Sequence, residues 1–210
     1  MNKDRRHFIK NAACLTAGLT LATLPGVAAE ASLQDEQESG LYLIGPQKGY
    51  TPHIGTLLGT MTMMRTWIVR GVEELSVKEL DFQIDDKSNS IGAMLWHLAA
   101  TERYYQLNTF EGLEWGTWDN EIKEIWDLPM GLGEDGREKI KGNKIKFYLE
   151  KLESVRAETE KQFAERTDDW LWESENFFDN LPTNNYAKWF HVCEHESNHN
   201  GQIKFIKKRM

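Results

Sequence analysis

The sequence of 210 residues is long enough for one domain with a sizeable core, and 40% of its residues are hydrophobic. Its formal charge is −8 at pH 7, from 33 acidic and 25 basic residues. Because Lys and Arg cluster only in the last few residues, the chain is not expected to bind nucleic acid or an anionic membrane surface.

Residues 1–29 have the layout of an export signal. Arg5 and Arg6 precede an apolar run over residues 12–24, and residues 27–29 (VAA) offer a small-residue cleavage site. The stretch DRRHFIK resembles the twin-arginine (Tat) pattern S-R-R-x-F-L-K. The apolar run is shorter than the roughly 20 residues that span a bilayer. We therefore expect cleavage, a periplasmic or otherwise exported protein, and no stable membrane anchor afterwards.

The chain without residues 1–29 has 21 basic and 32 acidic side chains, a formal charge of −11, and one cysteine, Cys193. It cannot form an internal disulfide, so packing must stabilise it. We expect Cys193 to be a small buried residue rather than a nucleophile. Residues 30–50 are polar and then rich in Gly and Pro, which favours a linker or an arm on the body. Residues 51–210 form the predicted domain.

Apolar residues at helical spacing predict four long helices. The first runs from Thr51, as N-cap, to about Leu75; the second follows the cap Ser90 and fades near residues 110–112. A third should begin at an Asn143 cap and end near residues 166–167, and the fourth should begin at residues 183–185 and continue to the end of the sequence. With no repeat and no convincing strand, this pattern indicates an all-α four-helix bundle.

The connections are less regular. Residues 76–79 (SVKE) form a capping box that opens a short turn. Residues 111–142 make a long connection between the second and third helices, with a short helix expected around Asn120–Trp126. Residues 168–182 are predicted to be an aromatic loop, with an extended piece at Trp170–Trp172. Four tryptophans on these connections are expected to pack against the core or line a pocket: Trp115, Trp118, Trp170 and Trp172.

The fourth helix carries His191, His195 and His199, each four residues from the next. Residues at i and i+4 lie on one helix face, so His195 and His199 can bind one metal ion together. His191 and His199 are about 12 Å apart along the axis at ~1.5 Å per residue, so all three cannot easily wrap one ion. We expect His191 to make a hydrogen bond or face solvent.

The segment HESNH matches H-E-x-x-H, in which Glu196 would be the general base of a zinc protease. The eleven residues after His199 contain no His, Asp or Glu, so we expect the third ligand from upstream. His97 lies mid-helix between Leu95 and Leu98 and is the best candidate by position. Taken alone, it could equally be a hydrogen-bonded core histidine.

His53 lies at the start of the first helix and is expected on the surface.

The segment SIGAMLWHLAATE around His97 and the motif HESNHNGQ at residues 195–202 resemble the DinB-like family of four-helix bundles. The resemblance covers about residues 51–209. It implies a divalent metal, Zn²⁺ or Ni²⁺, held by three histidines that correspond to His97, His195 and His199. It also places Gln202 beside these ligands as a supporting residue. The family often has Arg where this chain has Asn200, so no role is carried over to that position.

Relatives in that family include thiol-dependent transferases and isomerases and proteins described as metal-dependent hydrolases. A metal-dependent enzyme here would hydrolyse an ester or amide of a small-molecule substrate, or transfer a thiol. The candidate bases, or partners of the imidazoles, are Glu194, Glu196 and Glu102, although Glu102 lies ~140° around the helix from His97. Export favours hydrolysis, because low-molecular-weight thiols are cytoplasmic. The alternative is a non-catalytic metal- or ligand-binding bundle, as a monomer or a homodimer.

Overall fold

The structure, a computed structural model, describes residues 40–210, and residues 41–210 form one compact unit. The predicted export signal at residues 1–29 lies outside the described residues. Four long helices build the unit: α2 (Pro52–Val72), α4 (Ile91–Thr109), α7 (Ile145–Ala164) and α9 (Asn185–Lys207). The all-α class and the four-helix bundle predicted from the apolar spacing are therefore confirmed. None of the helices in the described part is long and apolar enough to cross a membrane.

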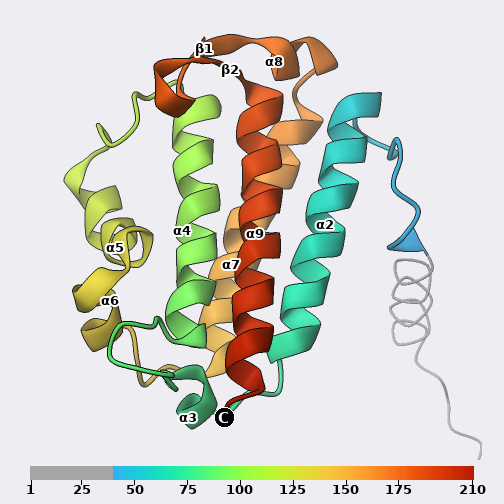
Figure 1. Ribbon diagram of the computed structural model, residues 1–210. Helices are drawn as coiled ribbons and strands as arrows, with labels where there is room; N and C mark the ends of the chain where they lie inside the picture. Colours follow the sequence, from blue (N-terminus) through green and yellow to red (C-terminus); the bar gives the residue numbers. More distant parts are fainter. Residues whose placement is uncertain (1–39) are drawn as a thin grey trace, which may run out of the picture. The chain divides into compact units, whose positions relative to one another are not determined.

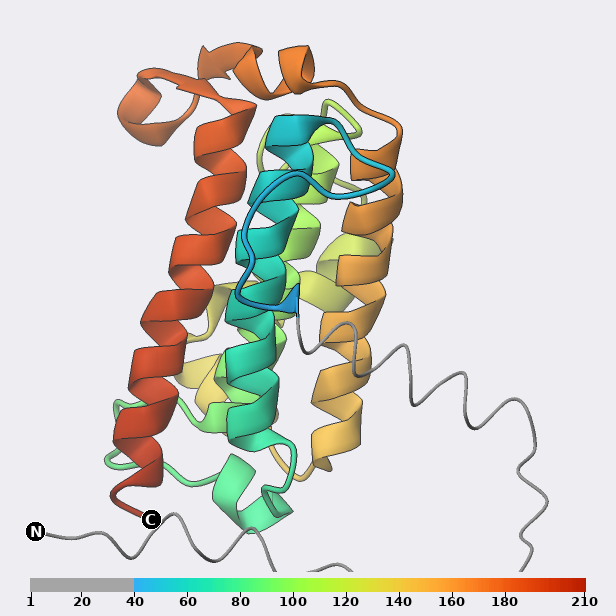
Figure 2. The same ribbon diagram turned by 90° about the vertical axis from the view of Figure 1, so that its right-hand side faces the viewer.

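Each long helix packs against two others, in the cyclic order α2, α9, α4, α7 (Figures 1 and 2). Helices α2 and α9 run in one direction, while α4 and α7 run in the other (Figure 1). Because α4 and α7 are parallel, the chain must return along the bundle between them. The long connection does so through α5 (Asn120–Gly131) and α6 (Gly133–Lys139), and α5 packs on α4. The expected short helix thus exists and extends five residues beyond Trp126.

The remaining elements close the two ends of the bundle. At one end, α3 (Val77–Leu80) begins with the predicted capping box between Ser76 and Glu79. The other end carries α8 (Asp168–Trp172), β1 (Ser174–Asn176), η1 (Phe178–Asn180) and β2 (Pro182–Asn184) (Figure 1). β1 and β2 pair antiparallel, with Glu175 opposite Thr183.

Three local predictions were wrong. Residues 170–172 are helical rather than extended, because two acidic residues in the first turn of α8 suit a helix N-terminus. The N-cap of α7 is Lys144, not Asn143, whose side-chain amide donates to the Tyr148 hydroxyl at 3.4 Å. The ends of α2 and α7, at Val72 and Ala164, lie two or three residues earlier than predicted, because helix ends are the least sharply defined part of a sequence pattern.

The segment before α2 lies along that helix. A Cβ atom added at Gly55 would stand 2.6 Å from the backbone nitrogen of Gln47, and one at Gly59 would approach the Gln47 side chain at 3.0 Å. Gly55 and Gly59, two of the three glycines in α2, therefore leave room for residues 44–47.

Two apolar clusters fill the bundle, one toward each end. The cluster toward α8 includes Met61, Tyr105, Phe163 and Val192. The cluster toward α3 includes Ile68, Leu98, Val155 and Ile203. Each long helix contributes one charged, buried residue where it passes from one cluster to the other: Arg65, Glu102, Arg156 and Glu196. The middle of the core is therefore polar.

These four side chains form one ion-pair network that ties the four helices together. Arg65 donates to Glu102 Oε2 at 2.7 Å and, through Nε, to Glu196 Oε1 at 2.9 Å. Arg156 donates through Nε to Glu102 Oε1 at 2.9 Å and through Nη2 to Glu196 Oε1 at 3.1 Å. Burial alone would raise the pKa of Glu102, but the charges of Arg156 and Arg65 hold it well below its usual value. The network fixes the register of α9 against the other helices.

Candidate metal centre

Three histidines from two neighbouring helices come together between α4 and α9. His195 and His199 lie one turn apart on α9, with ring centroids 4.6 Å apart. His97 on α4 faces both, with its ring centroid 5.0 Å from that of His195 and 5.2 Å from that of His199. One nitrogen of each ring lies within 4.8 Å of the others. The structure thus brings together the three residues selected from the sequence.

Two of the three rings are held by hydrogen-bond acceptors outside the cluster. Nδ1 of His97 donates to the backbone carbonyl of Pro129 at 2.9 Å. Pro129 lies in the last turn of α5, where helix carbonyls have no partner within the helix. Because Nδ1 carries the proton, Nε2 of the neutral ring has a free lone pair, which faces the other two histidines. Sequence reasoning missed this contact, since a backbone carbonyl has no side-chain signature.

The second anchored ring is that of His199. Its Nδ1 donates to Oε1 of Gln202 at 2.9 Å, so its Nε2 is also free in the neutral form. Gln202 therefore stands beside a candidate ligand, at the place expected from the resemblance. The same pattern, a ring nitrogen fixed by an outer acceptor, is usual for histidines that bind metals.

All three imidazoles are in the neutral form that binds metals. Burial lowers the pKa of His97, and burial with the nearby His199, His97 and His191 lowers the pKa of His195 to about 3. Burial and the neighbouring His97 lower the pKa of His199 to about 4. At neutral pH the cluster therefore offers lone pairs rather than positive charges.

The spacing of the nitrogens suits one ion. Nε2 of His97 lies 2.9 Å from Nε2 of His195. Two nitrogens bound to one ion at about 2.0–2.1 Å lie roughly 2.9–3.4 Å apart for bond angles near 90–110°. With the proton of His195 on Nδ1, a shared cation would bind both Nε2 atoms at once. The donor set and its spacing therefore fit a divalent metal ion.

The three glutamates considered as bases do not join this cluster. Among the described residues, the side chains whose nitrogen or oxygen atoms lie close enough to share one ion are the three histidines, and no carboxylate is among them. Glu196 and Glu102 are buried in the ion-pair network at the centre of the bundle. Glu194 is exposed on α9 and acts on His191 through its charge. The H-E-x-x-H match thus has a structural glutamate in its second position.

His191 continues the row of histidines toward the α8 end. Its Nδ1 lies 2.9 Å from the Tyr105 hydroxyl, and its ring lies 5.4 Å from that of His195 and 5.3 Å from that of Phe178. Burial lowers the pKa of His191 and raises that of Tyr105. The expectation that His191 makes a hydrogen bond is confirmed, and an aromatic wall borders the cluster on this side.

The four tryptophans of the connections have different surroundings. Trp115 packs edge-on against Tyr105, beside the histidine row, and Trp118 is buried against Tyr104. Trp170 packs on the core residue Phe163 at the α8 end. Trp172 is about half exposed on the surface.

Two further candidates lie outside the cluster. His53 is exposed and its Nδ1 lies 2.9 Å from Asp168 Oδ2, at the start of α2. Cys193 is half-buried and free, and burial raises the pKa of its thiol, so it stays protonated. His53 lies on the surface as expected, whereas Cys193 is partly rather than fully buried.

The sequence matches the model of a known family. The model of the family described as the DinB superfamily matches residues 61–203, which is more than half of the chain and includes all three clustered histidines. A search of curated proteins gave no match.

Proposed function

The chain belongs to the DinB superfamily, and on this premise we propose that it is a metal-dependent hydrolase of a small molecule. His97, His195 and His199 hold one divalent ion, Zn²⁺ or Ni²⁺. The observation that carries the proposal is the 2.9 Å approach of the Nε2 atoms of His97 and His195, with a ring nitrogen of His199 within 4.8 Å of both. Three protein ligands leave further coordination positions open, which is the arrangement of catalytic rather than structural zinc sites.

An ion held in this way supplies Lewis-acid chemistry, polarising a carbonyl and providing a nucleophile from water at neutral pH. The residues of the chain supply the rest. Pro129 and Gln202 hold two rings so that their Nε2 atoms converge. His97 and His199 are buried, whereas His195 is only partly buried, so a small molecule reaches the centre past His195. The aromatic wall around Tyr105 limits the access of water on one side.

The proposed location and the proposed class of substrate rest on the net charge of the chain and on its N-terminal sequence. An acidic chain offers little to nucleic acid, which supports a small-molecule substrate. The paired Arg5 and Arg6 before an apolar run support export by the twin-arginine route. Replacing both arginines with lysine should keep the protein in the cytoplasmic fraction; equal export of the variant would contradict this part of the proposal.

The test of activity compares purified wild type with His97→Ala. Zinc- or nickel-loaded wild type is expected to hydrolyse p-nitrophenyl esters, and EDTA or the His97→Ala substitution should abolish turnover. Chelator-sensitive transfer to thiol acceptors, without ester hydrolysis, would favour a thiol transferase instead. Metal binding without turnover on either substrate type would favour a non-catalytic carrier.

A further inference from the structure

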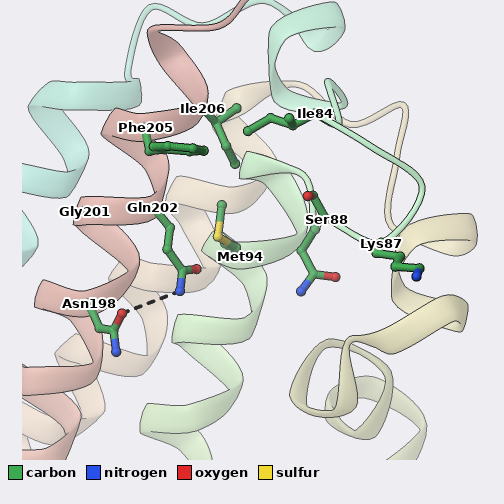
Figure 3. Close-up of a pocket in the computed structure, with 10 residues that line it drawn as sticks. Ile84, Lys87, Ser88, Met94, Asn198, Gly201, Gln202, Phe205 and Ile206 are labelled. Carbon is green, nitrogen blue, oxygen red and sulfur yellow. Dashed lines mark hydrogen bonds between the residues drawn. The ribbon is translucent and has the colours of Figure 1, made fainter.

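Regions toward both ends of the bundle adjoin the histidine cluster. Toward α3, a cavity of about 570 Å³ lies between the loop before α4 and the C-terminal part of α9 (Figure 3). Its lining includes Met94 and Gln202 but none of the three clustered histidines, which all lie within the described residues. Toward α8, the ring of His191 lies against that of His195, with centroids 5.4 Å apart. A molecule bound on the α8 side can therefore contact the cluster itself.

The α8 side carries an aromatic wall made of Tyr105, Trp115, Phe177 and Phe178. Trp115, on the connection after α4, has its ring centroid 5.2 Å from that of Tyr105 and 5.3 Å from that of Phe177. Phe178, in η1, packs on Phe177 at 5.1 Å and on His191 at 5.3 Å between ring centroids. The wall thus runs from α4 over two connections to the row of histidines.

Part of this wall is accessible from outside. Trp115 is 36% exposed, and Phe177 and Phe178 are half-buried. An aromatic ring pairs favourably with a second ring in edge-on or offset contact, in addition to the apolar area that the pair removes from water. The wall therefore favours a flat aromatic ligand.

His191 supplies a hydrogen-bond donor at the edge of the wall. Among the described residues, the Tyr105 hydroxyl has one hydrogen-bond partner, Nδ1 of His191, at 2.9 Å. Because Tyr105 is only 2% exposed, its O–H donates to Nδ1 rather than to water. A neutral imidazole that accepts at Nδ1 carries its proton on Nε2. Nε2 of His191 has no partner among the described residues and is not sealed from solvent, so a ligand can accept its proton.

The charges beside the wall favour an uncharged ligand. Nζ of Lys188 lies 4.6 Å from the centroid of the Phe177 ring, and the side chain is 2% exposed. This ammonium group is already paired with Glu175 and donates to Oδ1 of Asn108 at 2.9 Å. An anion would therefore gain little from it. A cation offers no acceptor to the Nε2 proton of His191.

We propose that the aromatic wall and His191 bind the substrate of the metal site, an uncharged aromatic ester or amide. The aryl ring lies against Trp115 and Phe178, and the carbonyl oxygen accepts from Nε2 of His191, beside His195. Tyr105 is a positioning residue, because it acts through His191. This inference rests on the proposed function, since the wall serves a reaction only if the neighbouring histidines hold metal.

Four substitutions separate the parts of this site. Trp115→Ala removes the most exposed ring of the wall, and Trp172→Ala is its matched control, because Trp172 is 48% exposed and stacks on Tyr186 instead. His191→Phe keeps an aromatic ring and removes the Nε2 donor. Tyr105→Phe keeps the ring and removes only the hydroxyl that fixes the proton of His191.

Acetophenone serves as the probe, because it has the aromatic ring and the carbonyl acceptor and cannot be hydrolysed. It is titrated into zinc-loaded, full-length protein and followed by ligand-observed NMR, with zinc content and circular dichroism measured on every sample. Cyclohexyl methyl ketone lacks the aromatic ring, and ethylbenzene lacks the acceptor. The same titrations are repeated after EDTA has removed the zinc.

We expect wild type and Trp172→Ala to bind acetophenone at least about threefold more tightly than cyclohexyl methyl ketone, with and without zinc. Trp115→Ala should bind acetophenone at least about threefold more weakly than wild type, with unchanged zinc content. His191→Phe should weaken acetophenone binding about fivefold and leave ethylbenzene binding unchanged. Nitrogen chemical shifts of His191 should show the proton on Nε2 in wild type and a mixture of tautomers in Tyr105→Phe.

Several results would overturn the substrate site and leave the metal site standing. They are wild type that does not bind acetophenone, either Trp115→Ala or His191→Phe binding it as wild type does, and a wild-type His191 with its proton on Nδ1. Binding that is lost with the zinc would show that the metal, not the wall, holds the probe. Wild type that retains no zinc but still binds acetophenone would instead overturn the proposed function and leave the wall as a ligand site.

Discussion

Oε1 of Gln202 lies 2.9 Å from Nδ1 of His199, one helical turn away on α9. This hydrogen bond keeps the proton on Nδ1, so that Nε2 faces the other two imidazoles. Gln202→Leu should therefore weaken zinc affinity by about 10–100-fold, as found for outer partners of metal-binding histidines. A competition titration against a chromophoric chelator measures this. Asn198→Ala is the control and should bind zinc as wild type does; a Gln202→Leu variant with wild-type affinity would show that the hydrogen bond does not orient the ring.

Glu196 is predicted to stabilise the fold rather than to act as a base. Glu196→Gln removes a buried negative charge from between Arg65 and Arg156, and should lower the free energy of unfolding by about 3–5 kcal/mol. Glu194→Gln, two residues away and exposed, should change it by less than about 0.5 kcal/mol. Urea denaturation of both variants measures the difference. If Glu196→Gln were as stable as wild type but inactive, the result would support a catalytic role for Glu196.

The bundle and the histidine trio could be predicted from the sequence because both depend on regular spacing. Apolar residues at helical intervals define the faces, and His195 and His199 at i and i+4 define half of the cluster. The two-helix pairing with His97 needed the resemblance as well, since spacing along one helix does not show which helix lies beside it.

Other features could not be predicted, for physical reasons. The carbonyl of Pro129 that anchors His97 is a backbone atom, and any residue would present one there. The return path through α5 and α6 follows from α4 and α7 being parallel, which the separate helical patterns do not reveal. The ion-pair network did leave a signal, because Arg65 occupies the apolar face of its helix, but a lone charge on that face does not identify its partner.

Asp168 caps α2 from outside that helix. Its carboxylate accepts from the backbone nitrogens of His53 and Ile54, at 3.0 and 3.1 Å, and from the Thr51 hydroxyl at 2.5 Å. Partial burial would raise the pKa of Asp168, but these hydrogen bonds lower it to about 2. Asp168→Ala should therefore cost about 1 kcal/mol of unfolding free energy near neutral pH.

The pH dependence of that cost has a fixed sign. A carboxyl whose pKa is lower in the folded than in the unfolded chain stabilises the fold above the unfolded value of about 4. The difference in unfolding free energy between wild type and Asp168→Ala should thus be constant from pH 7 to about pH 5. It should shrink as the pH falls from about 4 toward 2. A difference that grew with acidity would contradict the capping role.

Gly92 is predicted to be essential for the packing of α4 on α7. A Cβ atom there would lie 2.6 Å from the Tyr148 hydroxyl oxygen and 2.7 Å from the ring carbon that bears it, and Tyr148 is fully buried. Gly92→Ala should therefore destabilise the protein by about 1–3 kcal/mol.

The matched control is Gly71→Ala, which meets nothing within 4 Å and should stabilise the protein by about 0.5–1 kcal/mol. Thermal unfolding of the two variants shows the opposite shifts directly. Equal shifts would indicate that helix propensity alone, and not the contact with Tyr148, decides the effect at Gly92.

The central claim is that His97, His195 and His199 hold one divalent metal ion. The most direct measurement is the metal content of purified wild type and His97→Ala after loading with Zn²⁺ or Ni²⁺ and removal of free metal. We predict about one ion per chain in wild type and a large loss in His97→Ala, with both proteins folded by circular dichroism. Wild type with almost no retained metal, or His97→Ala with as much metal as wild type, would contradict the account.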